Sequence, residues 1–290
     1  MRKLNFFDIL IYIMVLVFSL FCIVPMLLVI MVSFTDESAI AKYGYRLIPR
    51  DLSLEAYGLI FNQGSTLINS YSVSLTITIV GTLLAVMITA MAAFTLANKQ
   101  VRYRNTLALY FFFTMIFNGG IVPWYIMCSK LGLQNNIFAL IIPGLVFNPF
   151  NLFLVRNFMK GIPDSLMESA KMDGAGDAVI AFRIYFPLCT PVLAAVALFY
   201  GLAYWNDWWN SIMLVENKNL YPLQYLLFKM QSELQMLRDL QIYSANTTVK
   251  PPTESLKMAT VVVTIGPIVF LYPFLQKYFV KGLIIGSVKG

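Results

Sequence analysis

Six long stretches of this sequence contain no Asp, Glu, Lys or Arg, and they constrain the fold more than any other feature. They cover residues 9–35, 71–98, 105–129, 131–155, 184–206 and 258–276. Each is long enough to cross a bilayer core of about 30 Å, which takes roughly 20 residues of helix. In lipid only helices and closed barrels satisfy their backbone polar groups, and continuous apolar stretches of this length are helical. The sequence therefore predicts an all-α integral membrane protein with six transmembrane helices.

The basic residues are placed as a membrane topology requires and not as a nucleic-acid surface. The net charge is +7, yet Lys99, Arg102 and Arg104 crowd one short loop without an acid, while the next loop holds only Lys130. The positive-inside rule puts the loop 99–104 in the cytoplasm, and counting helices then puts both termini there. The first apolar stretch is far longer than the roughly 7–15 residues of a signal-peptide core, so we expect it to be a retained helix. We expect no nucleic-acid partner.

The chain is predicted to form one membrane domain, 1–290, with two long outer loops at about 36–70 and 213–257. The first loop is expected to hold a short helix around 54–61. In the second, the segment beginning at Tyr221 has apolar residues three and four apart, which predicts a surface helix. Three cysteines without a CxxC spacing and the absence of histidine predict no metal site on this chain.

Three of the predicted spans contain helix-breaking residues. The third has Asn118-Gly119-Gly120, the fourth has Pro143-Gly144 and Asn148-Pro149, and the sixth has Gly266-Pro267. Proline removes a backbone hydrogen bond and kinks a helix. Glycine and proline are also ordinary in membrane helices, where they allow tight packing. Three interrupted spans favour helices bent around a translocation path.

A polar, glycine-containing segment at about 160–187 interrupts the apolar stretches on the side predicted to be cytoplasmic. It predicts a short helix starting near Pro163, with Ser165 and Glu168 spaced as a capping box, and ending at Gly174. Asp177 is expected to cap a second short helix that continues into the fifth span. We call this segment the bracket. From the residues alone, an interfacial linker and a docking site for another protein fit it equally well.

The bracket resembles the EAA motif of permease subunits of binding-protein-dependent ABC importers, E-A-A-x3-G-x9-I-x-L-P. The spacing agrees throughout, with Ser in place of the first Ala and Phe in place of Leu; the matching residues are Glu168, Ser169, Ala170, Gly174, Ile184, Phe186 and Pro187. Asp173 and Ala175 extend the likeness. In that family the bracket is a coupling helix that docks on a cytoplasmic ATPase. The resemblance implies that Glu168 is the polar anchor, Gly174 the turn, and Ala170 and Ala175 the close-packing surface.

The resemblance covers most of the chain and implies a type I importer permease of the carbohydrate-uptake class. "IVPWYIMCSKLGLQNN" is similar to the branch for oligosaccharides and larger saccharides. It implies a second, non-identical permease subunit, two ATP-binding subunits, an extracytoplasmic solute-binding protein and a place in a bacterial cytoplasmic membrane. The chain has no GxxxxGK[ST] phosphate loop, so ATP and Mg²⁺ are expected on the partner ATPase. This chain is then a transport subunit with no catalytic residues and no cofactor.

The end of the fifth span supplies candidates for the saccharide path. Aromatic faces stack on sugar rings and amides or carboxylates bind hydroxyl groups; residues of these kinds are Tyr204, Trp205, Asn206, Asp207 and Trp208, with Asn118 and Asn148 in the interrupted spans. For the tryptophans the interfacial aromatic belt is an equally good interpretation. Asp207 is the strongest candidate, because an acid near the membrane is costly unless it faces water or a partner. For the two asparagines, hydrogen bonding between helices is an open alternative.

Other functions fit the sequence less well. A permease for another cargo, such as peptides or polyamines, would share the bracket and is the closest competitor. An ion-coupled secondary transporter would need acids or paired charges inside the spans, which hold none. An intramembrane enzyme would need a nucleophile and base or a metal, and the chain has no histidine to supply one.

Overall fold

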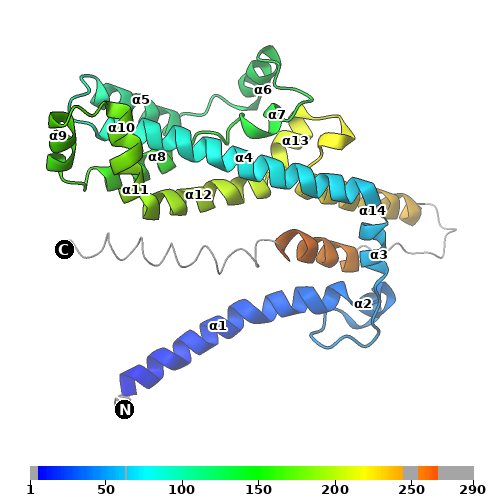
Figure 1. The fold of residues 1–290 in the computed structure, drawn as a ribbon. Coiled ribbons are helices and arrows are strands. Elements are labelled where there is room, and N and C mark those ends of the chain that lie inside the picture. Colours follow the sequence, from blue (N-terminus) through cyan, green and yellow to red (C-terminus); the bar gives the residue numbers. More distant parts are fainter. Residues whose placement is uncertain (1–5, 63, 244–253, 267–290) are drawn as a thin grey trace. The chain divides into compact units, whose positions relative to one another are not determined.

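The computed structural model describes residues 6–62, 64–243 and 254–266, which form two compact units (Figure 1). Of the described residues, those up to 67 and those from 227 onward belong to the first unit, and residues 68–226 belong to the second. The prolines and glycines predicted to interrupt the sixth span from residue 267 onward lie outside the described residues. Each unit is considered by itself below.

Most of the described chain is helical. The helices are α1 Phe6–Ser33, α2 Glu37–Tyr43, α3 Glu55–Phe61, α4 Gly64–Ala97, α5 Arg104–Ile116, α6 Ile121–Lys130, α7 Phe138–Ile141, α8 Pro149–Met159, α9 Asp164–Met172, α10 Asp177–Ile180, α11 Phe186–Leu188, α12 Thr190–Trp205, α13 Trp209–Leu214 and α14 Leu223–Tyr243. A π-helical turn, Ala181–Tyr185, joins α10 to α11, and residues 254–266 are also helical. The predicted helices at 54–61 and after Tyr221 are confirmed as α3 and α14.

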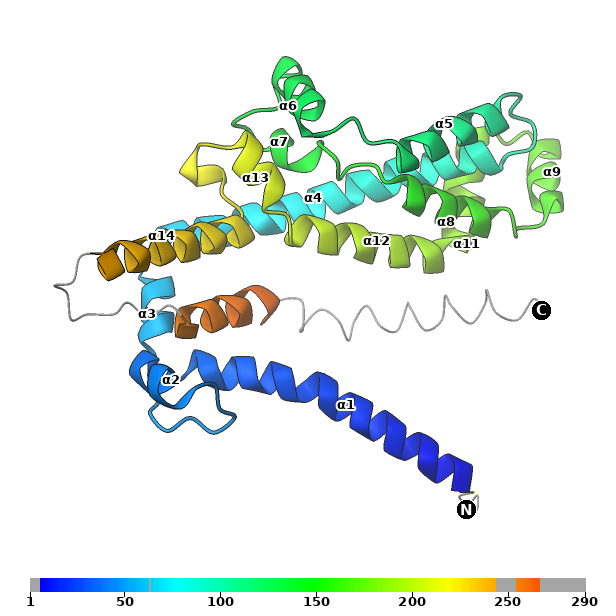
Figure 2. The same ribbon diagram turned by 180° about the vertical axis from the view of Figure 1, so that it is seen from behind.

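The second unit is built on the packing of α4 against α12. The two helices lie side by side in Figure 1 and in the reversed view of Figure 2, with α9 and α10 at one end and α6, α7 and α13 towards the other. The buried face of α4 carries small residues about one turn apart; they include Ser70, Ser74, Gly81, Ala85, Thr89 and Ala93. Small side chains let helix backbones approach closely, which drives association in lipid.

Only two of the six predicted spans are single long helices in the described residues. These are Phe7–Ser33 and Ser65–Ala97, which are long and apolar enough to cross a membrane. The third stretch is two helices bent by 117°, and the fifth is two bent by 83°. In the fourth, α7 and α8 are separate short helices, and of the sixth only 258–266 are described. The breaks expected in the third and fourth stretches are therefore present, a bend in the fifth was not expected, and both the count of six spans and the orientation of the termini stay predictions.

The break in the third stretch occurs at the predicted glycines. Gly120 has a φ of +87°, which glycine adopts at no steric cost. The Asn118 side chain accepts a hydrogen bond from the Gly120 N–H at 2.9 Å and so fixes the turn between α5 and α6. An amide that closes an Asx turn in this way competes with helical hydrogen bonding.

A proline accounts for the bend in the fifth stretch. Pro191 has no N–H to donate to the carbonyl of Pro187, and that carbonyl instead accepts from the Thr190 hydroxyl at 2.8 Å. The apolar run therefore bends at Cys189, and residues before it belong to the bracket. The span proper is the 16-residue helix α12, which is about 24 Å long at 1.5 Å per residue.

In the first unit, the end of α1 is tied to the loop that follows it. The Ser33 hydroxyl lies 2.8 Å from that of Tyr57, and the ring of Phe34 stacks on that of Tyr57. The Glu37 carboxylate accepts hydrogen bonds from the N–H groups of Glu254 and Ser255, at 3.1–3.2 Å. It thereby satisfies donors at the start of the helical segment 254–266, as an N-cap does.

Candidate functional site

The bracket is a helix–turn–helix whose turn explains the spacing of its motif. Gly174 follows the end of α9 with a φ of +81°. The Ala175 N–H donates to the Ala170 carbonyl at 2.9 Å, and the Gly174 N–H donates to that of Lys171 at 3.0 Å. This pair of bonds is a Schellman motif, which needs a left-handed residue four positions after the first acceptor. Ala170 and Ala175 both pack in the same hydrophobic core, which completes the motif's apolar contact.

The beginnings of the two bracket helices differ from the prediction. Pro163 is the residue before α9 and not its first residue, and Ser165 lies inside the helix, so no capping box forms. Asp164 instead places a carboxylate in the first turn, where it interacts favourably with the helix dipole. Asp177 is the first residue of α10 and not its cap, because its carboxylate pairs with the Lys171 ammonium at 3.2 Å.

Two lysines make contacts within the bracket and between the bracket and the loop after α4. Lys171 bonds to Gln100 as well as to Asp177, and Lys99 forms an ion pair with Asp164. These contacts fix the position of the bracket relative to α4. By contrast, Glu168 is exposed and has no ion-pair or hydrogen-bond partner for its side chain among the described residues. Its charge is available to another protein.

The other motif residues divide between the outer and inner sides of the bracket. Ser169 and Asp173 are exposed beside Glu168, and Pro187 is exposed in α11. Ala170 is buried, while Ala175 and Ile184 are partly buried against the core. The outer surface therefore carries acidic and polar residues beside the exposed Met172, and the alanines hold the bracket to its own unit.

A cavity of about 320 Å³ lies between the start of α8 and α12. Its polar lining comes from Asn148, Asn151 and Tyr200, and its apolar lining includes Phe150 and Phe199. Asn148 caps α8, accepting from the Phe150 N–H at 2.9 Å, while its own N–H donates to the Tyr200 hydroxyl at 3.0 Å. Asn151 is 5% exposed, and its side-chain amide makes no hydrogen bond to the described residues. An amide in that state is available to a hydroxyl group in the cavity.

Of the seven predicted path residues, Asn148 alone lines this cavity. Tyr204 is fully buried; its hydroxyl donates to the Ile141 carbonyl at 2.8 Å and its ring lies on Gly81. Trp205 is also buried. Asn118 is exposed at the break after α5. These side chains have packing or turn-forming contacts of their own.

The residues that follow α12 pack against α7 and α13. Asn206 is exposed and donates back to the Leu202 carbonyl at 2.8 Å. One carboxylate oxygen of Asp207 accepts from the Asn210 N–H at 3.3 Å, and the other is buried without a hydrogen-bond partner. Trp208 is half-buried against the cluster around α7. The structure does not bring these residues together around one cavity, and their role in a path stays a prediction.

The family is decided by comparison of the whole sequence. A profile of the family described as "Binding-protein-dependent transport system inner membrane component" matches residues 83–285. The chain belongs to this family. It is accordingly an inner membrane subunit of a binding-protein-dependent transport system.

Relatives of this permease cover nearly its whole length. It is 38% identical over 270 residues to Protein LplC of Bacillus subtilis, covering 92% of this chain and 90% of that one. It is 37% identical over 289 residues to the polygalacturonan/rhamnogalacturonan transport system permease protein YtcP of the same organism, covering 99% and 100%. Among solved structures, it superimposes with a TM-score of 0.80, at 28% identity, on a chain of a bacterial ABC transporter involved in the import of the acidic polysaccharide alginate, covering 96% and 98%.

Two cavity residues of this permease were not among the sequence-based candidates. Asn151 is three residues after Asn148, a spacing that puts both on one face of a helix, so the pair "NPFN" carried a usable signal. Tyr200 lies one turn before Tyr204, and both looked alike in the sequence. In the structure both face α4: the Tyr200 hydroxyl lies 2.7 Å from that of Thr89, and the Tyr204 ring lies on Gly81. Only the position of α8 along α12 shows that Tyr200 also lines the cavity.

Proposed function

We propose that this permease is a membrane subunit of an ATP-driven importer of oligosaccharides, with a non-identical second permease, two ATPase subunits and a solute-binding protein. In this proposal the chain spans a bacterial cytoplasmic membrane six times, with both termini and the bracket in the cytoplasm. ATP and Mg²⁺ belong to the ATPase subunits, and this chain contributes half of the path.

The cargo assignment rests mainly on the relatives. YtcP is named for polygalacturonan and rhamnogalacturonan, and the AraQ permease of Halalkalibacterium halodurans, 30% identical over 275 residues, is named for arabinooligosaccharides. These names share a saccharide cargo. The alginate importer, whose chain has the same fold, adds a third example.

The chemistry of the cavity beside α8 supports a hydroxyl-rich cargo. Its lining contains amides, a tyrosine and phenylalanines, and no charged side chain. Hydroxyl groups can bond to Asn148 and Asn151 while a ring face stacks on Phe150 or Phe199. We therefore propose this cavity as part of the saccharide path.

The cargo is tested by measuring ATP hydrolysis of the assembled transporter with its solute-binding protein. Saccharide-loaded binding protein should stimulate hydrolysis, and peptide-loaded or polyamine-loaded protein should not. Stimulation by peptides and by no saccharide would remove the assignment. The path is tested with Asn151→Ala, which should lower saccharide uptake several-fold. Its matched control is Asn157→Ala, an exposed asparagine on the same helix.

We propose that the acidic outer face of the bracket docks on the ATPase. Glu168 and Asp173 are exposed and without ion-pair partners among the described residues, whereas Asp164 and Lys171 are occupied within the unit. ATPase movement applied to this face would pass into α12, because the bracket and α12 share one core.

Docking is tested by cross-linking in the assembled transporter. Ser169→Cys, on the exposed face of α9, should be captured by an ATPase cysteine or a short bifunctional reagent. Asn219→Cys is the control, since it is exposed in the loop predicted to lie on the outer side. Equal capture at both positions, or at neither, would contradict the docking proposal.

A further inference from the structure

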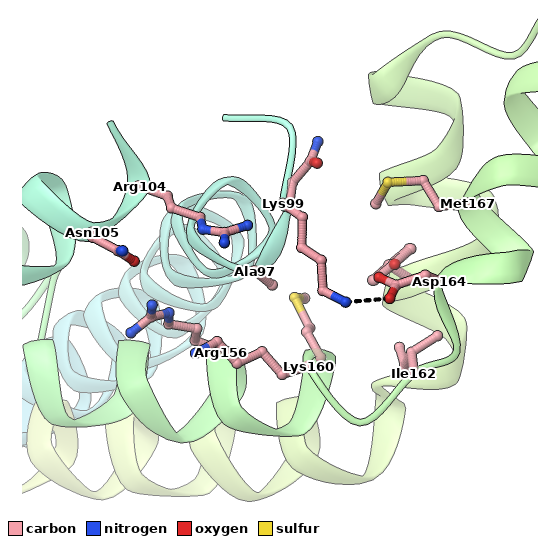
Figure 3. A pocket seen from close by; sticks show the side chains of 12 residues that line it. Ala97, Lys99, Arg104, Asn105, Arg156, Lys160, Ile162, Asp164 and Met167 are labelled. Atoms are coloured by element: carbon pink, nitrogen blue, oxygen red, sulfur yellow. Dashed lines mark hydrogen bonds and ion pairs between the residues drawn. The ribbon is translucent and has the colours of Figure 1, made fainter. Parts of the chain in front are cut away.

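A second cavity, of about 300 Å³, lies where the loop after α4, the end of α8 and the start of α9 meet (Figure 3). Its lining has four basic side chains, Lys99, Arg104, Arg156 and Lys160, and one acidic side chain, Asp164. The one acid is already paired with Lys99, as the dashed line in Figure 3 shows. The charge of this cavity is therefore strongly positive.

Three of the cations in the cavity have no acidic partner. Among the residues that the structure describes, no carboxylate is within ion-pair distance of Arg104, Arg156 or Lys160. Arg156 donates to the Leu96 carbonyl at 3.3 Å, whereas the side chains of Arg104 and Lys160 make no hydrogen bond within the described part of the chain. Burial, together with the neighbouring charges of Arg156 and Arg104, lowers the pKa of Lys160. An anion between these side chains would relieve that repulsion.

A buried tyrosine adds an unused donor to the same cavity. Tyr185 is 3% exposed and lines the cavity, yet its hydroxyl makes no hydrogen bond to any described residue. Its ring is held edge-on against Phe94, with centroids 5.1 Å apart, so the hydroxyl position is fixed. The hydroxyl can therefore donate to an anion oxygen in the cavity that it lines.

The level of the cavity along the spans indicates which anion it takes. Three apolar stretches end at its lining: 71–98 ends at Asn98, 105–129 begins at Asn105, and 131–155 ends just before Arg156. The cavity therefore lies at the depth of lipid headgroups. Beside it Tyr103, just before α5, and Leu107 of α5 are 62% and 40% exposed and can contact acyl chains. A soluble anion would make no contact with these exposed apolar side chains.

We propose that this cavity binds the phosphodiester headgroup of an acidic phospholipid from the cytoplasmic leaflet. Arg104, Arg156 and Lys160 contact the phosphate oxygens, and the Tyr185 hydroxyl donates to one of them. Basic recesses between membrane helices on the cytoplasmic side recognise anionic lipids in this way. The bound lipid bridges α5, α8 and the base of the bracket. The assignment to the cytoplasmic leaflet depends on the orientation proposed above, whereas the position and charge of the cavity do not.

The site is tested on the intact transporter with its partner subunits, in neutral detergent, by native mass spectrometry during titration with phosphatidylglycerol. The double variant Arg104→Gln/Lys160→Gln should lose one bound lipid at concentrations that saturate the unmodified protein. Recovery should take about thirtyfold more lipid, since each of the two basic residues contributes about one kcal/mol near a charged surface. Arg102→Gln/Arg183→Gln removes the same charge from exposed positions outside the cavity and should keep the lipid.

Three further measurements decide between the possible occupants. Arg104→Lys/Lys160→Arg keeps both charges and should keep the lipid, which separates loss of binding from loss of folding. Phosphatidylcholine should not replace phosphatidylglycerol, and inorganic phosphate should not displace it. Displacement by inorganic phosphate would overturn the lipid assignment in favour of a free anion. An unchanged lipid count in Arg104→Gln/Lys160→Gln, with loss of the ATPase subunit instead, would overturn it in favour of an ATPase carboxylate.

Discussion

The contact between Gly81 of α4 and Tyr204 of α12 gives the sharpest prediction for stability. A Cβ atom added at Gly81 would lie 2.5 Å from Cζ of Tyr204 and 2.7 Å from both Cε atoms. Carbon atoms pack best at about 3.5–4.0 Å, so the helices or the ring must move by roughly 1 Å. The ring has little freedom, because Tyr204 is fully buried and its hydroxyl is bonded to the Ile141 carbonyl.

Two opposing effects set the magnitude for Gly81→Ala. Overpacking in a close-packed core costs about 1–3 kcal/mol. Replacing a helical glycine by alanine gains about 1 kcal/mol of helix propensity. The net effect is a loss of stability of up to about 2 kcal/mol. For a domain of this size that loss lowers the midpoint of thermal unfolding by roughly 2–8 °C.

The assay is the heating of a fluorescent-protein fusion in detergent, followed by size-exclusion chromatography to find the temperature at which half of the folded peak is lost. The matched control is Gly201→Ala on the facing helix, where an added Cβ would lie an ordinary 3.6 Å from the Thr82 hydroxyl oxygen. That variant should be neutral or slightly stabilised. In a Tyr204→Ala background, Gly81→Ala should no longer cost stability. If Gly81→Ala behaves like Gly201→Ala, the close approach of α4 and α12 is wrong.

Three other predictions follow from named contacts. Tyr200→Phe removes the hydroxyl that accepts from the Asn148 N–H and bonds to the Thr89 hydroxyl, and it should cost about 1–3 kcal/mol in the same heating assay, whereas Tyr110→Phe, an exposed control, should cost nothing measurable. Glu37→Ala should cost about 0.5–2 kcal/mol by removing the cap on residues 254–266, and Glu37→Gln, which keeps an acceptor oxygen, should cost less; equal costs would refute the capping role. Gly174→Val should lower uptake per ATP hydrolysed. The positive φ at this position costs a residue other than glycine about 1–2 kcal/mol. Gly174→Asn should retain uptake, because asparagine tolerates a positive φ and an added Cβ meets no atom within 4 Å. Loss of uptake in both variants would point to side-chain crowding instead.

The sequence was most informative where a local pattern determines the structure. Charge-free stretches located α1 and α4, and the alanine–glycine spacing of the bracket located its turn, because a Schellman motif is local along the chain. The breaks at Asn118 and Pro143 were also visible, since glycine and proline act on their own backbone.

Sequence reasoning was weaker where two distant segments compete for a group. Asp177 was expected to cap a helix, but Lys171 takes its carboxylate. The fifth span was expected to start at residue 184, but Pro191 bends the chain at Cys189. Tyr204 was expected on the path because tyrosine rings stack on sugars. Its ring instead packs on Gly81, a contact that only the tertiary structure reveals. Such outcomes depend on which helix faces which, and a hydrophobic pattern does not specify that.

One core joins the proposed docking face to the proposed saccharide cavity. Met167 and Ala170 of the bracket, Tyr185 and Cys189 at the bend, and Val196 of α12 are all buried in the cluster that also contains Tyr200 at the cavity. Close-packed interiors have few voids and transmit displacement instead of absorbing it. A force on the outer face of α9 would therefore reach the cavity through contiguous side chains, without any hinge between them. The helices on either side of Cys189 are bent by 83°, so in the proposed assembly a push along the first would tilt α12.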